Sequence, residues 1–335
     1  MNLVLLLEWT IKSLVILVVF VILGAAYLTF FERRVLARIQ TRIGPNRAGP
    51  FGVLQPMADV IKLVFKEDLI PAQADKVLFI LAPVITVVPA FILLAVIPIG
   101  PNIGNISMGL AADINVGVLY IMAAASIAVY GIVIAGWASA NKYALMGGIR
   151  STAQMISYEL ALALSFVGPI LLTNSENPMS VSEIVIAQRS LWFIFLQPVG
   201  FLIYLMAAIA EVNRAPFDLP EAEQELTAGY HTEYSGLKFA LFYLAEYGKM
   251  IVISFIGATL FLGGYWGPFV EQVPLLGPLY LIAKVVALLF VIVWLRATFP
   301  RLRYDNLMAF GWKFMLPVAL LNVMVTALIV VLVGG

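Results

Sequence analysis

Four glutamates lie inside, or at the ends of, long apolar runs. Glu32 closes one run, Glu159 lies inside a second, and Glu211 ends a third. Glu246 lies about nine residues into a fourth run, which is roughly 14 Å along a helix. An ionised carboxylate facing lipid costs several kcal/mol, so these side chains are expected to face a bundle interior or a wet cavity. Groups in such places commonly carry protons, and the pattern favours a proton relay.

Structural ion pairs are the alternative for two of these glutamates. Lys249 follows Glu246 by three residues, so the two side chains could pair on one helix face. Glu32 precedes Arg33 and Arg34, and it could lie with them among lipid headgroups.

The segment from 212 to 237 is an acidic loop between two apolar runs. It carries Asp218, Glu221, Glu223, Glu225 and Glu233, with Arg214 as its one basic residue before Lys238. Pro216 and Pro220 would interrupt a regular helix here. The loop could simply be solvated. Its aromatic residues Phe217, Tyr230 and Tyr234 favour a docking surface, a funnel that feeds the membrane carboxylates, or both.

Composition indicates an integral membrane protein. Of 335 residues, 62% are hydrophobic and 12% are charged, against about 45–50% and about 25% in soluble domains. A spanning helix needs about 20 apolar residues. Eight candidate spans follow, at 11–31, 77–98, 115–137, 153–173, 191–211, 237–263, 279–297 and 312–333. We therefore predict an all-α, polytopic fold with one membrane domain over 1–335, and a first span that is not a cleaved signal.

Lysine and arginine predict the orientation of these spans. Sixteen of the twenty basic residues fall in or beside the loops after spans 1, 3, 5 and 7: Arg33, Arg34, Arg38, Arg42, Arg47, Lys62, Lys66, Lys76, Lys142, Arg150, Arg214, Lys238, Arg296, Arg301, Arg303 and Lys313. Lys12 and Arg189 fall on the other side, and Lys249 and Lys284 lie within spans. We expect these large loops in the cytoplasm and both termini outside, in a bacterial plasma membrane or the equivalent mitochondrial inner membrane.

The first loop contains a shorter amphipathic segment over 51–66. Its apolar residues recur every three or four positions and form one stripe: Val53, Leu54, Met57, Val60, Ile61, Val64 and Phe65. This length is too short to span, so the segment is predicted to lie in the membrane plane. A loop helix packed on the protein is the alternative.

Other chemistry is poorly supported by the residue types. The chain has no cysteine and one histidine, His231, which excludes disulfides and cysteine-held iron–sulfur clusters. The glycines near Gly100 and Gly104 lack the βαβ context of a nucleotide fingerprint. Nothing indicates nucleic-acid binding.

Four long motifs stand out in the sequence. They are FFERRVLARIQTRIGPNRAGPFGVLQPMADVIKLVFKED (30–68), GWASANKYALMGGIRSTAQMISYEL (136–160), EVNRAPFDLPEAEQELTAGYHTEYSG (211–236) and RATFPRLRYDNLM (296–308). These motifs resemble one family of membrane subunits, the H subunits of NADH:quinone oxidoreductase (respiratory complex I). They occur in the family's order, and the resemblance covers almost the whole chain.

The resemblance implies a subunit that anchors the peripheral redox arm and forms most of the quinone entry passage. Quinone is then the substrate, while FMN and iron–sulfur clusters belong to partner subunits and none is bound by this chain. Partners would be the quinone-site and iron–sulfur subunits, small membrane subunits next to the antiporter-like arm, and lipid. The relay would comprise Glu159, Glu211 and Glu246, fed by Glu221, Glu223, Glu225 and Glu233, with Glu32 as a further candidate. Arg38, Arg47, Phe51, Val60 and Phe217 are the candidates for the quinone passage.

Two other functions are compatible with parts of this pattern. A stand-alone proton-coupled transporter could also have eight spans with membrane carboxylates, but no repeat between the halves is visible. A related assembly, either a membrane-bound hydrogenase or a photosynthetic complex using ferredoxin and plastoquinone, is the other. The complete EAEQELTAGYHTEYSG segment favours a quinone-reducing member, without distinguishing ubiquinone, menaquinone and plastoquinone. The arginines after the first span could set topology and contact lipid headgroups rather than orient quinone.

Overall fold

The computed structural model describes residues 24–101, 109, 114–218 and 229–334, with isolated positions before residue 24. Apart from one isolated bridge between Pro98 and Gly109, every regular element in these residues is a helix. Six helices there are long and apolar enough to cross a membrane: α4 (Lys76–Leu94), α5 (Gly117–Ala138), α6 (Lys142–Leu172), α11 (Gly236–Phe261), α12 (Leu276–Thr298) and a continuous helix over Tyr304–Leu332. The predicted all-α, polytopic membrane fold is confirmed.

The last of these helices contains a local distortion. It consists of α13 (Tyr304–Phe310), a π-turn η4 (Gly311–Met315) and α14 (Leu316–Gly334). The remaining elements are short: α2 (Gly24–Ile39), η2 (Pro50–Gly52), α3 (Gln55–Val64), α7 (Val181–Ala187), α8 (Phe193–Leu196), α9 (Pro198–Glu211) and η3 (Gly229–His231). The predicted first span, 11–31, lies only partly within the described residues.

The fifth predicted span, 191–211, is not continuous. It is divided into α8 and α9 at Gln197, whose backbone is non-helical. Pro198 follows at the first position of α9, where its missing N–H costs nothing. The Gln197 side chain donates to Thr326 Oγ1 at 2.5 Å and accepts from Asn322 Nδ2 at 3.1 Å, which attaches this break to α14.

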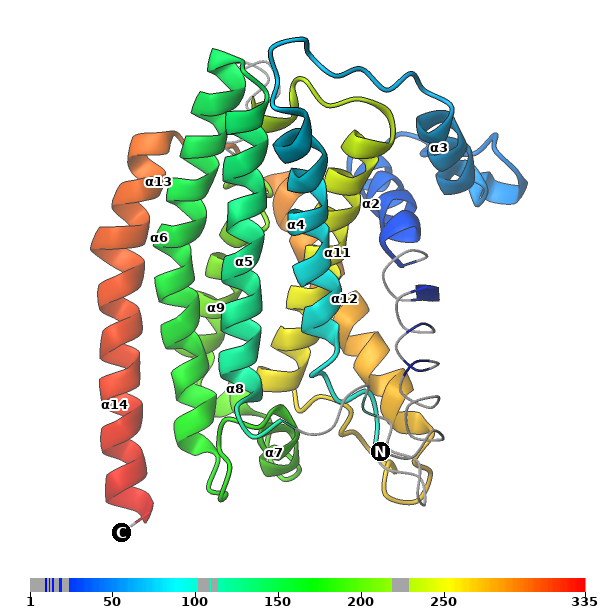
Figure 1. The fold of residues 1–335 in the computed structure, drawn as a ribbon. Coiled ribbons are helices and arrows are strands. Elements are labelled where there is room, and N and C mark those ends of the chain that lie inside the picture. Colours follow the sequence, from blue (N-terminus) through cyan, green and yellow to red (C-terminus); the bar gives the residue numbers. More distant parts are fainter. Residues whose placement is uncertain are drawn as a thin grey trace.

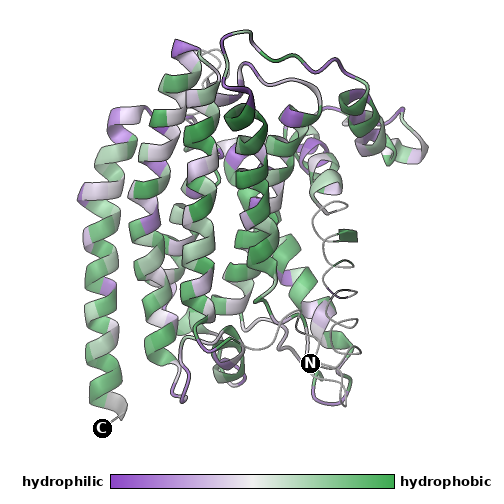
Figure 2. Ribbon diagram, viewed as in Figure 1, coloured by the Kyte–Doolittle hydropathy of each residue, from purple (hydrophilic) through white to green (hydrophobic). Residues whose placement is uncertain are grey.

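The helices form one bundle with α11 at its centre (Figure 1). α11 packs against α2, α4 and α12, and it is the most buried of the six long helices. The C-terminal helix packs against α6 at the edge of the bundle and is the least buried. Apolar residues dominate along the long helices, and polar residues concentrate near the ends (Figure 2).

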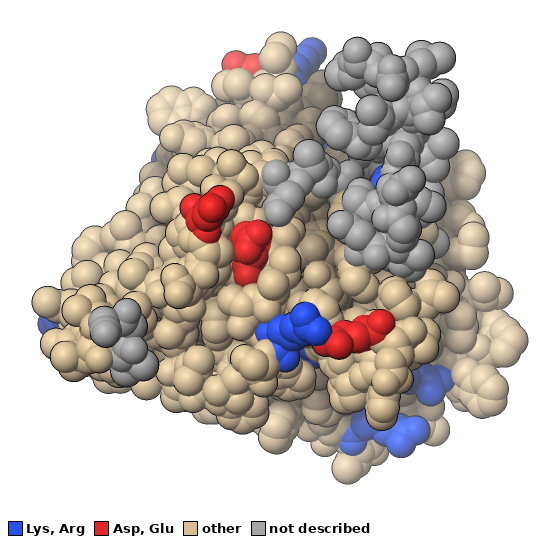
Figure 3. Space-filling model, turned by 90° about the horizontal axis from the view of Figure 1, so that it is seen from below, with Lys and Arg blue, Asp and Glu red and all other residues tan. Residues whose placement is uncertain are grey.

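The loops divide between two ends of the bundle. Segments 40–75, 139–141 and 299–303 lie at the upper end in Figure 1, with α3 beyond the tip of α2. Among the described residues, the opposite face carries few charged groups (Figure 3). One of its exposed pairs joins Arg189 to Glu271. The bundle therefore concentrates basic residues at the end where the charge pattern predicts the cytoplasmic loops.

α3 lies beside the bundle and is attached to it on both sides. Arg33 of α2 pairs with Asp59 at 2.7 Å, and Arg34 donates to the carbonyl of Phe51. Beyond its other end, Asp68 pairs with Lys238 of α11 at 2.8 Å. Ser235 continues this contact by donating to the Glu67 carbonyl at 3.1 Å.

A close helix contact gives the first prediction. Gly131 lets α5 approach α4, because a Cβ there would lie 2.1 Å from Thr86 Oγ1 and 2.8 Å from the Thr86 backbone nitrogen. Gly131→Ala should therefore separate these helices and lower the amount of assembled subunit in membranes, with a stability loss of about 1–3 kcal/mol. Gly24→Ala, whose added methyl meets only a flexible end of Ile251 at 3.3 Å, is the control. Equal assembly of both variants would contradict the contact.

Candidate functional site

Arg214 lies at the centre of a buried charge cluster. Its Nε is 2.6 Å from Glu246 Oε1, and its Nη1 is 3.4 Å from Glu32 Oε1. Arg296 of α12 also pairs with Glu32. The side chains of Arg214 and Glu32 are only 5% and 2% exposed, and that of Glu246 is 13% exposed. Charges this deeply buried must be paired, so α2, α11, α12 and the segment after α9 share one electrostatic unit.

A tight turn after α9 places the Arg214 guanidinium. Asn213 adopts a left-handed conformation (φ 57°), and the Phe217 backbone N–H donates to the Arg214 carbonyl at 2.8 Å. The buried Gln154 amide of α6 donates to the carbonyls of Ala210 and Phe217, at 2.8 and 2.7 Å. Arg214 also lies over the ring of Tyr247, 4.5 Å from its centroid. The turn is therefore held from α6 while its cation reaches α11.

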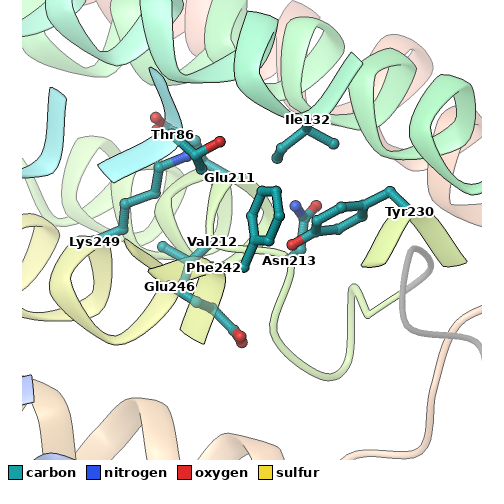
Figure 4. A pocket seen from close by; sticks show the side chains of 9 residues that line it. All are labelled: Thr86, Ile132, Glu211, Val212, Asn213, Tyr230, Phe242, Glu246 and Lys249. Carbon is teal, nitrogen blue, oxygen red and sulfur yellow. The ribbon is translucent and has the colours of Figure 1, made fainter. Parts of the chain in front are cut away.

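Two further buried ionisable residues lie next to this cluster, Glu211 at the end of α9 and Lys249 on α11. Glu211 and Lys249 are each 8% exposed. In Figure 4 the Lys249 side chain extends toward Glu211 and Thr86, whereas Glu246 points to the other side. The predicted structural pairing of Glu246 with Lys249 is therefore replaced by Arg214 with Glu246. Glu32 is equally buried with two arginines and does not lie beside Arg33 and Arg34 at the surface.

Glu159 lies farther along α6 and is half-buried. Ser126 of α5 donates a hydrogen bond to its carboxylate. Glu159, the fourth of the predicted membrane carboxylates, thus faces a neighbouring helix through a hydroxyl rather than a cation.

The acidic loop is only partly described. Glu221, Glu223 and Glu225 lie outside the described residues. Glu233 accepts from Asn141 Nδ2 at 2.6 Å and lines an open surface hollow between 71–73 and 139–143.

Burial of His231 lowers its pKa to about 4, so its imidazole is uncharged at neutral pH.

The five candidates for the quinone passage separate into two groups. Arg38, Arg47, Phe51 and Val60 are exposed around α3 and the turns that precede it, with Phe51 at 75%. Phe217 is buried in the bundle and packs on Tyr158, with ring centroids 5.6 Å apart.

Comparison with known proteins identifies the family. Residues 11–327 match the family model described as NADH dehydrogenase. A protein of Thermomicrobium roseum, named as the H subunit of NADH-quinone oxidoreductase, is 52% identical over 92% of both chains. Proteins named in the same way from Dehalococcoides mccartyi and Syntrophobacter fumaroxidans (the latter with the number 2 in its name) are 52% and 48% identical, over 94% and 98% of this chain and 85% and 99% of their own. The chain belongs to this family of NADH-quinone oxidoreductase H subunits.

In this member of the H-subunit family, sequence reasoning missed three cations of the site. Arg214 and Arg296 were used only to predict the orientation of the spans, and Lys249 was considered only as a possible ion-pair partner of Glu246. One signal was present for Arg214, since it is the lone basic residue of an otherwise acidic loop that directly follows Glu211. Ser126, the partner of Glu159, carried no distinguishing signal.

Removal of the central cation gives the second prediction. Arg214→Met keeps the unbranched stem of the side chain but removes the guanidinium, so Glu246 and Glu32 stay buried with less compensation. The expected loss of stability is about 3–5 kcal/mol, measured as a lower melting temperature and less subunit assembled in membranes. Arg303→Met is the matched control, because Arg303 pairs with Asp305 at the surface and should cost about 1 kcal/mol or less. Equal losses in the two variants would contradict the importance of the buried cluster.

Proposed function

We propose that this chain is the membrane subunit of a proton-pumping NADH:quinone oxidoreductase that couples quinone reduction to proton translocation through its buried glutamates. The observation that carries the proposal is the row of membrane carboxylates, each with a partner on another element. Glu32 and Glu246 share Arg214, Glu211 faces Lys249, and Glu159 accepts from Ser126. Family membership favours such a subunit over a stand-alone transporter.

Compensated carboxylates suit proton transfer better than isolated ones. An unpaired buried carboxylate would be held protonated by the cost of its charge. A nearby cation or hydroxyl lowers that cost, so both protonation states are accessible and a proton can be passed onward. Glu221, Glu223, Glu225 and Glu233 would supply protons or respond to quinone chemistry from the acidic loop over 212–237.

The second part of the proposal is a quinone passage at α3. The residues in and around this helix expose large apolar side chains, which include Phe51, Met57, Val60, Val64 and Phe65. Its attachments to α2 and α11 keep this surface beside the bundle without covering it. Such a surface suits the membrane interface over 51–66, where a long-tailed quinone would enter, with Arg38 and Arg47 near the headgroup.

A separate apolar groove lies along the bundle. It has a volume of about 250 Å³ and lies between α2, α11 and α12. Tyr27, Phe31 and Phe255 are among its lining residues. A groove of this chemistry would accommodate a hydrocarbon tail from the bilayer.

The proposed orientation in the membrane and the proposed partners follow from the distribution of charge. The end that carries the basic loops and α3 would face the bacterial cytoplasm and bind the peripheral arm, whose subunits hold FMN and the iron–sulfur clusters. The other end, where the C-terminal helix finishes, would face outward. Small membrane subunits would continue the proton path from Glu159, which is only half-buried in this chain.

The relay is tested at the carboxylates themselves. Glu211→Gln and Glu246→Gln preserve shape but cannot release a proton, so each should lower quinone reduction and proton pumping by at least about tenfold. Both are measured in membrane vesicles with NADH as donor. Glu271→Gln changes an exposed ion pair at the opposite face and serves as the control. Assembled Gln variants with normal turnover and pumping would remove the relay role.

The passage is tested with quinones of different tail length. Val60→Asp combined with Val64→Asp places charge on the apolar face of α3. Reduction of a long-tailed quinone should fall several-fold more than reduction of a short-tailed one, because only the former must enter from the bilayer. Val60→Leu with Val64→Leu keeps the apolar face and should retain both activities. An equal response to both tail lengths would argue against an entrance here.

A further inference from the structure

Lys249 places a buried ammonium group next to the membrane carboxylates, and the relay as proposed above gives it no role. It lies on α11, three residues after Glu246, and is only 8% exposed. Within the described part of the chain no direct hydrogen bond or ion pair is formed by its ammonium. A buried lysine is costly unless nearby charge compensates it, so the acidic groups around Lys249 should indicate its role.

Those surroundings are three acids. Glu211, Glu246 and Glu159 are all near enough to attract the Lys249 ammonium electrostatically. Its side chain extends toward Glu211 and Thr86 in Figure 4. Glu246 already has Arg214 at 2.6 Å, which leaves Glu211 as the acid that Lys249 compensates.

Two small cavities meet at this pair. The first also reaches Thr86 and Glu246, and the second also reaches Met122 and Leu162. Glu211 and Lys249 line both cavities. Each cavity has about 20 Å³, which is room for about one water molecule. The first has several polar groups in its lining. The second is lined by apolar side chains apart from Tyr204, Glu211 and Lys249, which are the groups that a water molecule there would contact.

The second cavity leads toward Glu159. Met122 lies one helical turn from Ser126, whose hydroxyl donates to both the Met122 carbonyl and the Glu159 carboxylate. Leu162 lies one turn beyond Glu159 on α6. Lys249 and Glu211 therefore stand between the Glu246 side and the Glu159 side of the row.

We propose that Lys249 is the positioning residue that controls proton passage through Glu211. The inference rests on the proposed relay. With Glu211 ionised, the ammonium is held at Glu211. A proton that leaves Glu246 and reaches Glu211 through water in the first cavity neutralises Glu211 and leaves Glu246 ionised.

The ammonium then turns toward Glu246, which lies one turn away on the same helix. Glu211 passes its proton through the second cavity toward Glu159 and is ionised again, which draws the ammonium back. One proton moves from Glu246 to Glu159 in each cycle. The cycle closes when Glu159 releases its proton to a neighbouring subunit and Glu246 takes up the next proton from the side of the acidic loop. Glu211 and Glu246 each have a neighbouring cation when they are ionised, and Glu159 has the Ser126 hydroxyl.

The test compares charge-removing and charge-keeping changes. Lys249→Met in the intact complex should lower the number of protons pumped per electron and slow quinone reduction by at least about tenfold. Lys249→Arg should restore much of both. Lys313→Met changes an exposed lysine on the C-terminal helix and should alter neither. The Glu211→Gln, Lys249→Met double variant should be no worse than Glu211→Gln alone, because the two act as one unit.

The outcomes separate the inference from the relay. If Glu211→Gln lost pumping while Lys249→Met kept the full proton-to-electron ratio, the role of Lys249 would be overturned and the relay would stand. Normal pumping by Glu211→Gln would overturn the relay itself. Should Lys249→Met fail to assemble, the double variant leaves neither charge unpaired and should assemble; its failure would also overturn the pairing.

Discussion

The buried guanidinium of Arg214 constrains most of the site. It is compensated by Glu32 from α2 and Glu246 from α11, while Arg296 from α12 adds a second cation at Glu32. Because a buried charge without a partner costs several kcal/mol, these helices cannot shift independently. The pairing of Arg214 with Glu246 also determines which acid the neighbouring lysine can compensate. Since Glu246 is taken by Arg214, Lys249 is left to compensate Glu211, and the two small cavities meet at that pair.

Local pattern and hydropathy were sufficient to predict the long helices, since a run of about 20 apolar residues forms few stable structures other than a membrane-spanning helix. They also placed the amphipathic helix after α2, observed as α3. The break at Gln197 was not predicted, although Pro198 directly after it disfavours a helical conformation at Gln197. The contact of the Gln197 side chain with Thr326 and Asn322, more than 100 residues away, could not be predicted from local pattern. Pairing between charges is equally non-local: sequence proximity suggested Glu246 with Lys249, whereas the fold provides Arg214.

Charge balance connects the structure to proton movement. Each carboxylate of the row has a cation or a hydroxyl nearby, from a different element, so a proton can move without leaving an isolated charge behind. The surface proposed for quinone entry is separate from this row, because the apolar residues of α3 lie outside the bundle while Glu211 and Glu246 lie inside it. The attachment of α3 to both α2 and α11 joins the two regions, since these helices also carry Glu32 and Glu246.

The most direct measurement is the infrared difference spectrum of the intact complex between its resting state and the state after quinone reduction. A carboxyl group that gains or loses a proton changes its C=O stretching band. A relay through Glu211 predicts such a band, present in the unaltered complex and absent after Glu211→Gln. A difference spectrum without any glutamate carboxyl band, or one that is unchanged by Glu211→Gln, would contradict proton transfer through this residue.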